Sequence, residues 1–130
     1  MFLLDTNTLI YFFKGIGNVS KNLLSHSPKE IAIPSVVVYE LEVGIAKSTM
    51  REKRKKQLQT LLSQVQVLDF TCKEAKASAT LRADLEKKGE PIGPIDTLIA
   101  GFSLAHNLTL VTNNTKEFEK VAGIKLENWL

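Results

Sequence analysis

Short apolar runs separated by helical segments constrain the fold of this chain more than any other feature. Phe2–Leu4 and Ile31–Ile33 are unbroken apolar runs, Val65–Phe70 alternates as a strand does, and Leu108–Val111 is a fourth predicted strand. Strands that alternate with helices imply right-handed crossovers and a mainly parallel sheet. We therefore expect an α/β fold, a three-layer α/β/α sandwich, formed as one domain by residues 1–130.

Capping residues and apolar residues spaced three or four apart predict the helices. The expected helices run from Asp5–Asn7 to Lys14, from about Val19 to Ser25, from Ser35 as N-cap to about Ser48, through Leu58, Leu61, Leu62 and Val65, from Lys73 to Lys88, from the loop before Pro94 to His106 with Asn107 as a left-handed cap, and from Thr115 to about Val121. The segment Ile124–Trp129 is predicted to add an edge strand, with Trp129 in a packing role.

Composition limits the class of protein. The 130 residues are 44% hydrophobic and 24% charged, which is typical of one ordered globular domain. No segment approaches the roughly 18–20 apolar residues that span a bilayer, and the apolar start is interrupted by Asp5 and lacks a basic leader. Cys72 is the only cysteine, and with His26 and His106 it matches no usual zinc spacing. We expect a cytoplasmic protein without a membrane partner.

Three carboxylates lie in apolar surroundings, each near the end of a separate predicted element. Asp5 directly follows a strand, Glu40 lies on the apolar stripe of a helix, and Asp96 shares a helical stripe with inward-facing residues. Burying such acids is costly unless something positive holds them together. A divalent cation is the most economical candidate for this role. In open α/β sheets, ligands bind at the carboxyl ends of the strands, and Asp5 lies at such an end.

Each acid also has a purely structural explanation. Asp5 can cap the helix that follows it, and Asp96 near a helix start is favoured by the helix dipole. Glu40 can extend past the edge of the core into solvent, and Glu42 competes with it for the inward position. Three inward-facing acids on separate elements are more simply explained by one site than by three separate structural roles.

Polar residues after the last central strand are predicted to reach the same sheet edge as Asp5. Thr112 and Asn114 follow that strand and Glu117 lies one turn later, although Asn113–Asn114 also has the composition of a simple turn. Thr6 and Asn7, beside Asp5, are further candidates for the site.

Ligands that are all oxygen, with no cysteine or histidine nearby, select Mg²⁺ or Mn²⁺. Asp5 and Asp96 are the expected primary ligands, and Glu40 either holds a second metal or orients the attacking water. Such a metal lowers the pKa of a bound water and offsets charge on a phosphoryl transition state. The predicted reaction is therefore hydrolysis of a phosphodiester.

Positive charge gathers in one stretch of a chain whose net charge is +3. Only Glu52 opposes this basic set, which consists of Lys47, Arg51, Lys53, Arg54, Lys55 and Lys56. Two interpretations remain open: the set holds a nucleic-acid backbone, or it is an ordinary solvated helix face.

Four motifs in this order and spacing resemble the PIN domain, specifically the VapC ribonucleases of bacterial toxin–antitoxin pairs. The resemblance covers essentially the full length and rests on Leu3–Asn7, Ser35–Ser48, Arg82–Ala100 and Leu110–Phe118. Each motif alone is loose, whereas the ordered set is quite specific.

The resemblance implies a PIN-like fold, an acidic Mg²⁺ site onto which Asp5, Glu40 and Asp96 carry over, and cleavage of RNA. Transfer RNA is a recurring substrate in this family, and some members cut initiator tRNA. The resemblance also implies a homodimer, a cognate VapB-type antitoxin whose peptide lies across the site, and contact with operator DNA only through the antitoxin complex. Many relatives carry a fourth acid where this chain has Asn114, so Glu117 is a possible substitute and the number of metals stays open.

Two alternative functions remain open. The same site can cut DNA or flap structures, although the chain has no insertion for binding them. The Asn114 departure also fits a catalytically weak partner that binds an antitoxin and regulates a promoter. A haloacid-dehalogenase-type phosphatase needs a second acid two residues after the first, where this chain has Asn7.

Overall fold

Five parallel strands form one sheet in the computed structural model, which describes all residues from 1 to 130. The strand order is β3-β2-β1-β4-β5, and every neighbouring pair is parallel. The expected α/β sandwich is therefore confirmed, with a sheet that is entirely parallel. The strands are β1 (Phe2–Leu4), β2 (Ile31–Pro34), β3 (Gln66–Leu68), β4 (Thr109–Val111) and β5 (Lys125–Glu127).

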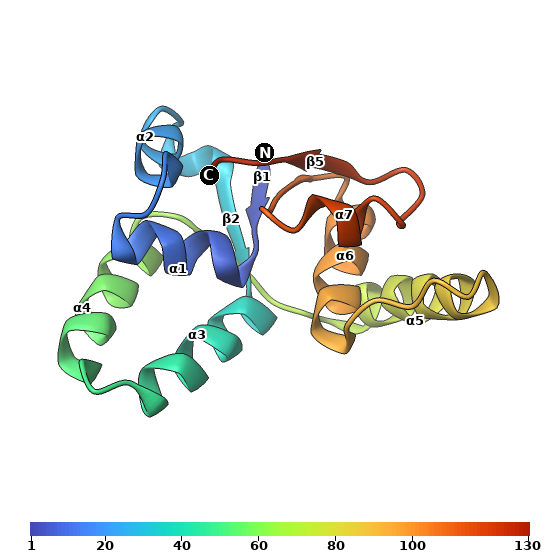
Figure 1. The fold of residues 1–130 in the computed structure, drawn as a ribbon, viewed down its shortest axis with the longest axis horizontal. Helices are drawn as coiled ribbons and strands as arrows, with labels where there is room; N and C mark the ends of the chain where they lie inside the picture. Colours follow the sequence, from blue (N-terminus) through green and yellow to red (C-terminus); the bar gives the residue numbers. More distant parts are fainter.

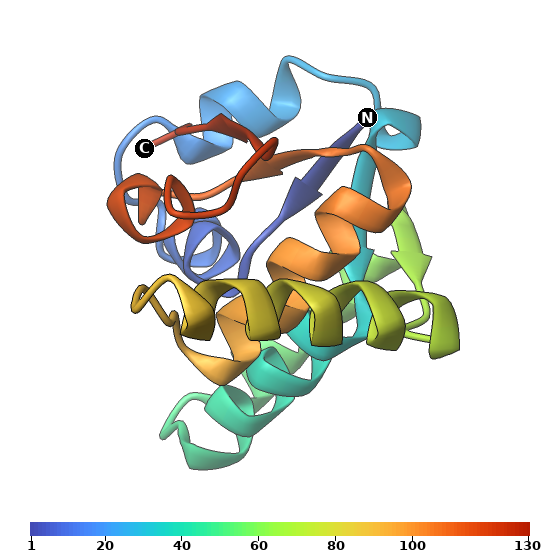
Figure 2. The same cartoon turned by 90° about the vertical axis from the view of Figure 1, so that its right-hand side faces the viewer.

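Helices cover both sides of this sheet. Figure 1 shows α1, α2 and α4 on one side of β1 and β2, and α5 and α6 on the other. Figure 2 shows α5 crossing in front of α6. The helices are α1 (Thr6–Lys14), α2 (Val19–Leu24), α3 (Ser35–Lys47), α4 (Arg51–Leu62), α5 (Cys72–Lys87), α6 (Pro94–His106) and α7 (Thr115–Phe118), with a 3₁₀ helix at Pro28–Glu30.

The carboxyl ends of the central strands define one edge of the molecule. Strand β1 lies between β2 and β4, so the chain order reverses there, and such a switch point is where open α/β sheets bind ligands. Leu4 is in register with Val111, and the Asp5 N–H donates to the Val111 carbonyl at 3.2 Å. Asp5 and Thr112 therefore leave the sheet side by side. Figure 1 shows α1, α3 and α6 starting near this edge.

The core is formed by the central strands and the inward stripes of the helices. Leu3, Leu4 and Leu110 have no exposed surface. The predicted stripe of α4 is confirmed in part: Leu58 and Leu61 are buried and Leu62 is half-buried, whereas Val65 lies beyond the end of the helix. Trp129 is also buried, as expected, and packs near the rings of Phe2 and His26. No helix of the structure has both the length and the apolar character needed to cross a bilayer.

Three local predictions are corrected by the structure. Ser35 is the first residue of α3 and not its N-cap: Pro34 takes that place, and the Ser35 hydroxyl accepts the Phe70 N–H at 3.0 Å. Helix α4 begins at Arg51, so much of the basic set lies within the helix instead of preceding it. Helix α7 ends at Phe118, three residues before its expected end. The left-handed cap at Asn107 is confirmed, with φ 52°.

Candidate active site

Asp5 is both a helix cap and a buried acid. Its Oδ1 accepts the Thr8 N–H at 2.9 Å, which confirms the capping explanation for this residue. The side chain is only 4% exposed, and this burial raises the pKa of Asp5, although hydrogen bonds from Thr112 and Thr8 partly lower it. Because no lysine, arginine or histidine forms an ion pair with Asp5, its charge is incompletely compensated.

Glu40 faces the start of α1. The Thr6 hydroxyl donates a hydrogen bond to its Oε1, so α3 and α1 are joined next to Asp5. Glu40 is half-buried, whereas Glu42 is exposed. The rotation of α3 therefore turns Glu40, the preferred candidate, toward the start of α1, and leaves Glu42 in solvent.

Asp96 occupies the first turn of α6 and is half-buried. Burial is the largest cause that raises the pKa of Asp96 to about 6, followed by the negative charges of Asp5, Glu40 and Glu117. Because such charge effects weaken with distance, these four acids lie in one neighbourhood although they come from four separate parts of the chain. We call these four residues the acidic edge.

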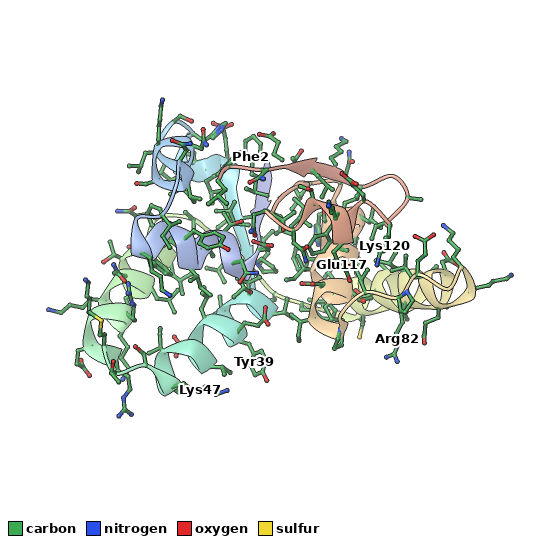
Figure 3. The ribbon with its side chains drawn as sticks, viewed as in Figure 1. Phe2, Tyr39, Lys47, Arg82, Glu117 and Lys120 are labelled. Atoms are coloured by element: carbon green, nitrogen blue, oxygen red, sulfur yellow. The ribbon has the colours of Figure 1, made fainter.

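Glu117 is the one member of the acidic edge that has a cationic partner. Lys120 lies 3.3 Å from Glu117 Oε2, and Figure 3 shows both on the same side of the molecule as α6. Lys120 was not among the residues singled out from the sequence, although its position three residues after Glu117 is a recognisable signal. The charge that Glu117 contributes is therefore partly offset.

The remaining predicted site residues occupy different positions around this edge. Thr112 is fully buried, and its hydroxyl accepts the Asn114 N–H at 3.0 Å. Asn114 itself is exposed and caps α7 by position, while Asn7 is exposed and makes no side-chain hydrogen bond. Thr6 and Thr112 therefore hydrogen-bond Glu40 and Asp5, respectively, whereas the side chains of Asn7 and Asn114 form no hydrogen bond to an acid.

The donor chemistry of the acidic edge fits a hard divalent cation. Its carboxylates offer only oxygen, and neither histidine nor cysteine is among the groups that shift the pKa of Asp96. No three His, Cys, Asp or Glu side chains lie close enough together to form a finished ion cage. The structure therefore shows acids from separate elements whose charges act on Asp96, without a finished ion cage.

The basic set divides into two parts. Five of its members are exposed and form no ion pair: Lys47, Arg51, Lys53, Lys55 and Lys56. Arg54 is half-buried instead, and its Nη1 donates to the Phe13 carbonyl at 3.2 Å and to Gln57 Oε1 at 2.8 Å. Five cations are thus free to meet an anion on the surface, and one is held between α4 and α1.

Comparisons with known proteins identify the family of this chain. The PIN domain family model matches residues 2–124. Ribonuclease VapC2 of Rickettsia felis is 40% identical, with 99% of this chain and 98% of the relative covered. The tRNA(fMet)-specific endonuclease VapC of Shigella flexneri is 36% identical, with 98% and 97% covered.

A solved structure extends the likeness to three dimensions. The crystal structure of VapBC2 from Rickettsia felis bound to a DNA fragment from its promoter matches with a TM-score of 0.90 and 38% identity, over 99% of this chain and 98% of that one. The PIN-like fold and the family resemblance expected from the motifs are both confirmed. The chain therefore belongs to the PIN-domain family and, within it, to the VapC ribonucleases.

Proposed function

We propose that this protein is a metal-dependent endoribonuclease that acts as the toxin of a VapBC-type toxin–antitoxin pair. Membership in the VapC ribonucleases supports the class of reaction. The observation that carries the proposal is the setting of Asp5, which is 4% exposed at the carboxyl end of β1 without an ion-pair partner, next to the hydrogen bond from Thr6 to Glu40. Burial and the charges of Asp5, Glu40 and Glu117 also raise the pKa of Asp96 to about 6. A fold that concentrates negative charge in this way, without a matching lysine or arginine on Asp5, Glu40 or Asp96, is prepared for a cation.

Asp5 and Asp96 are the proposed metal ligands. Asp5 is fixed by its cap to Thr8, which engages Oδ1 and leaves Oδ2 outside the cap, and Asp96 stands at the start of α6. The resident cation is proposed to be Mg²⁺ or Mn²⁺. When bound, it would lower the pKa of a water molecule and offset negative charge in the phosphoryl transition state.

Glu40 is the proposed group that orients the attacking water or completes the metal site. The Thr6 hydroxyl donates to one carboxylate oxygen of Glu40 and thereby fixes its direction. The other oxygen remains available to accept a proton from water during attack on the phosphorus. Glu117, partly neutralised by Lys120, contributes the fourth acid that Asn114 does not supply.

The proposed substrate is RNA, and transfer RNA, including initiator tRNA, is the first candidate because the Shigella flexneri relative is named for that activity. The exposed cations of α4 and Lys47 would hold the phosphate backbone. The proposed partners are a cognate VapB-type antitoxin and a second copy of this chain. Contact with operator DNA is proposed only through the antitoxin complex, because the similar Rickettsia felis protein is bound to promoter DNA as a VapBC2 complex.

Side-by-side digestion tests this proposal. Purified protein is incubated with matched single-stranded RNA, single-stranded DNA, a flap substrate and initiator tRNA, each with Mg²⁺, with Mn²⁺ and with EDTA. We expect cleavage of RNA alone, in either metal, and none in EDTA. Equal cleavage in EDTA would contradict the metal mechanism, and preferred cleavage of DNA or flaps would favour the alternative nuclease. Absence of all cleavage, with antitoxin binding intact, would favour the regulatory partner.

A further inference from the structure

A cavity lies next to the acidic edge and includes Glu40 in its lining. It has a volume of about 220 Å³ and is enclosed by α1, α3 and α4. Figure 1 shows α4 bridging the far ends of α1 and α3. We call this cavity the three-helix pocket. Its lining includes Ile10, Phe13 and Lys14 of α1, Glu40 and Gly44 of α3, and Arg54 of α4.

The three-helix pocket combines an apolar wall with two unpaired cations. Ile10 and Phe13 belong to the wall. Lys14 forms no ion pair or side-chain hydrogen bond, and Arg54 uses only its Nη1, for the Phe13 carbonyl and Gln57. The Nε and Nη2 groups of Arg54 are therefore free to donate to an anion.

Glu40 joins this pocket to the acidic edge. The same side chain that accepts from Thr6 also lines the cavity. A ligand in the pocket therefore lies next to the acids that are proposed to cut the substrate. The pocket is below the roughly 300–1,000 Å³ that typical cofactor and drug-sized sites occupy, so it has room for a single ring system.

We propose that the three-helix pocket receives one unpaired base of the RNA substrate, next to the phosphate that is cleaved, with Arg54 and Lys14 holding an adjoining phosphate. This inference rests on the proposed ribonuclease function and deepens it. An aromatic and aliphatic wall beside free cations is the combination that single-stranded nucleic acid uses. A peptide would have to bring a carboxylate as well as an apolar side chain to match the same lining.

Gly44 belongs to the lining of the pocket and provides a direct test. A Cβ added at Gly44 meets no heavy atom within 4 Å, and its φ lies in the ordinary helical region. An alanine is therefore accommodated at position 44 without a clash, and leucine is chosen to add bulk at the pocket lining. Ala46 is exposed on the same helix and does not line the pocket, so Ala46→Leu is a matched control.

The experiment measures RNA affinity in proteins that cannot cut. Gly44→Ala, Gly44→Leu and Ala46→Leu are each combined with Asp96→Asn. Binding is followed by fluorescence anisotropy with a labelled anticodon stem–loop RNA and with versions that carry one abasic loop position each. We expect Gly44→Leu to raise Kd about tenfold and Gly44→Ala less, with Ala46→Leu unchanged. The RNA that lacks the base bound in the pocket should bind the Gly44→Leu protein and its parent with equal affinity. The abasic position of that RNA identifies the base.

Different failures of this experiment have different meanings. If Gly44→Leu binds every RNA as tightly as its parent while the wild type still cuts RNA, the pocket inference is wrong and the ribonuclease proposal stands. If Gly44→Leu keeps RNA affinity but loses an antitoxin peptide, the occupant is a peptide. If the wild type neither binds nor cuts RNA, both proposals fall. Melting temperatures check folding, and Gly44→Ala supplies the reading if Gly44→Leu does not fold, because alanine favours the helix.

A salt titration tests the role of the cations separately. Lys14→Gln should lower the slope of log Kd against log salt concentration by about 0.7, the value for one phosphate contact on a single strand. An unchanged slope would remove Lys14 from the proposed phosphate contact.

Discussion

Two buried carboxylates of this molecule have opposite surroundings. Asp5 is 4% exposed and Glu74 is 2% exposed, so burial alone does not separate them. Glu74 accepts the Thr71 N–H at 2.7 Å and the Thr71 hydroxyl at 2.8 Å, and it contacts His106 Nε2 at 3.1 Å. The bonds from Thr71 are the main cause that lowers the pKa of Glu74, whereas burial raises the pKa of Asp5.

The difference separates a structural acid from a candidate functional acid. Glu74 has its partners within the fold, and it joins the start of α5 to the last residue of α6. Asp5 and Asp96 form no ion pair within the fold, and a proton or a cation from solution relieves their charge. Neutralising Asp96 should therefore lower activity without lowering stability, whereas neutralising Glu74 should lower stability without lowering activity.

The largest expected effect follows from Asp96→Asn. The change removes a proposed metal ligand, so RNA cleavage should fall by roughly a hundredfold or more. The free energy of unfolding in EDTA should stay the same or rise, because repulsion from Asp5, Glu40 and Glu117 is relieved. Initial rates and urea unfolding measure the two quantities. Cleavage that survives, or a protein that unfolds more easily, would place Asp96 with the structural acids.

Glu74→Gln is the converse change. It leaves His106 without its carboxylate partner and weakens the start of α5, so the free energy of unfolding should fall by about 1–3 kcal/mol. Cleavage per folded molecule should be unaffected, because Glu74 is not among the acids that act on Asp96. Urea unfolding at neutral pH gives the first value, and rates normalised to folded protein give the second. A loss of rate without a loss of stability would contradict this assignment.

The dependence of stability on pH should differ in sign between the two places. The pKa of Asp96 is raised from 3.8 to about 6, so folded protein without metal binds this proton more tightly than unfolded protein and loses stability as the pH rises through that window. The pKa of Glu74 is lowered from 4.5, so its contribution is present above that value and is lost as the pH falls below it.

Urea unfolding in EDTA at a series of pH values separates these contributions. Asp96→Asn should flatten the loss between pH 3.8 and about 6, and Glu74→Gln should flatten the loss below pH 4.5. Identical pH profiles of the free energy of unfolding for Asp96→Asn and Glu74→Gln would contradict the opposite pKa shifts of these two acids.

The smallest expected effects concern the fourth acid. Glu117→Gln should reduce cleavage by only a few fold, because Lys120 already offsets part of its charge. Asn114→Asp should change the rate by still less, since the Asn114 side chain is exposed and makes no cap hydrogen bond. Rates at limiting Mg²⁺ measure both changes. A larger effect at Asn114 than at Glu117 would reverse their proposed order.

The sheet was predictable from the sequence, and so were the elements that carry Asp5, Glu40 and Asp96, for a physical reason. Apolar runs and caps are local signals, and acids on inward-facing positions remain visible without a fold. The apolar neighbours of Glu40 favoured it over Glu42 as the inward acid, but its contact with Thr6 was not predictable, because that contact joins residues far apart in the sequence. The same holds for Ser35, whose hydroxyl serves Phe70 and not its own helix.

The buried acid at Glu74 was partly predictable. Thr71 and Glu74 have the spacing of a capping box, and this local signal marks the true start of α5. Its pairing with His106 lies 32 residues away in sequence and emerges only from the packing of α5 on α6. The pocket beside Glu40 was not predictable either, because three helices that are separate in sequence enclose it.

Calorimetric titration with Mn²⁺ tests most directly whether the acidic edge is a cation site. Wild-type protein, Asp96→Asn and Glu74→Gln are compared near pH 6, where a proton on Asp96 must be displaced by the metal. We expect binding with proton release by the wild type and by Glu74→Gln, and loss of both in Asp96→Asn. Equal binding by all three proteins, or none by the wild type, would contradict a cation site at the acidic edge.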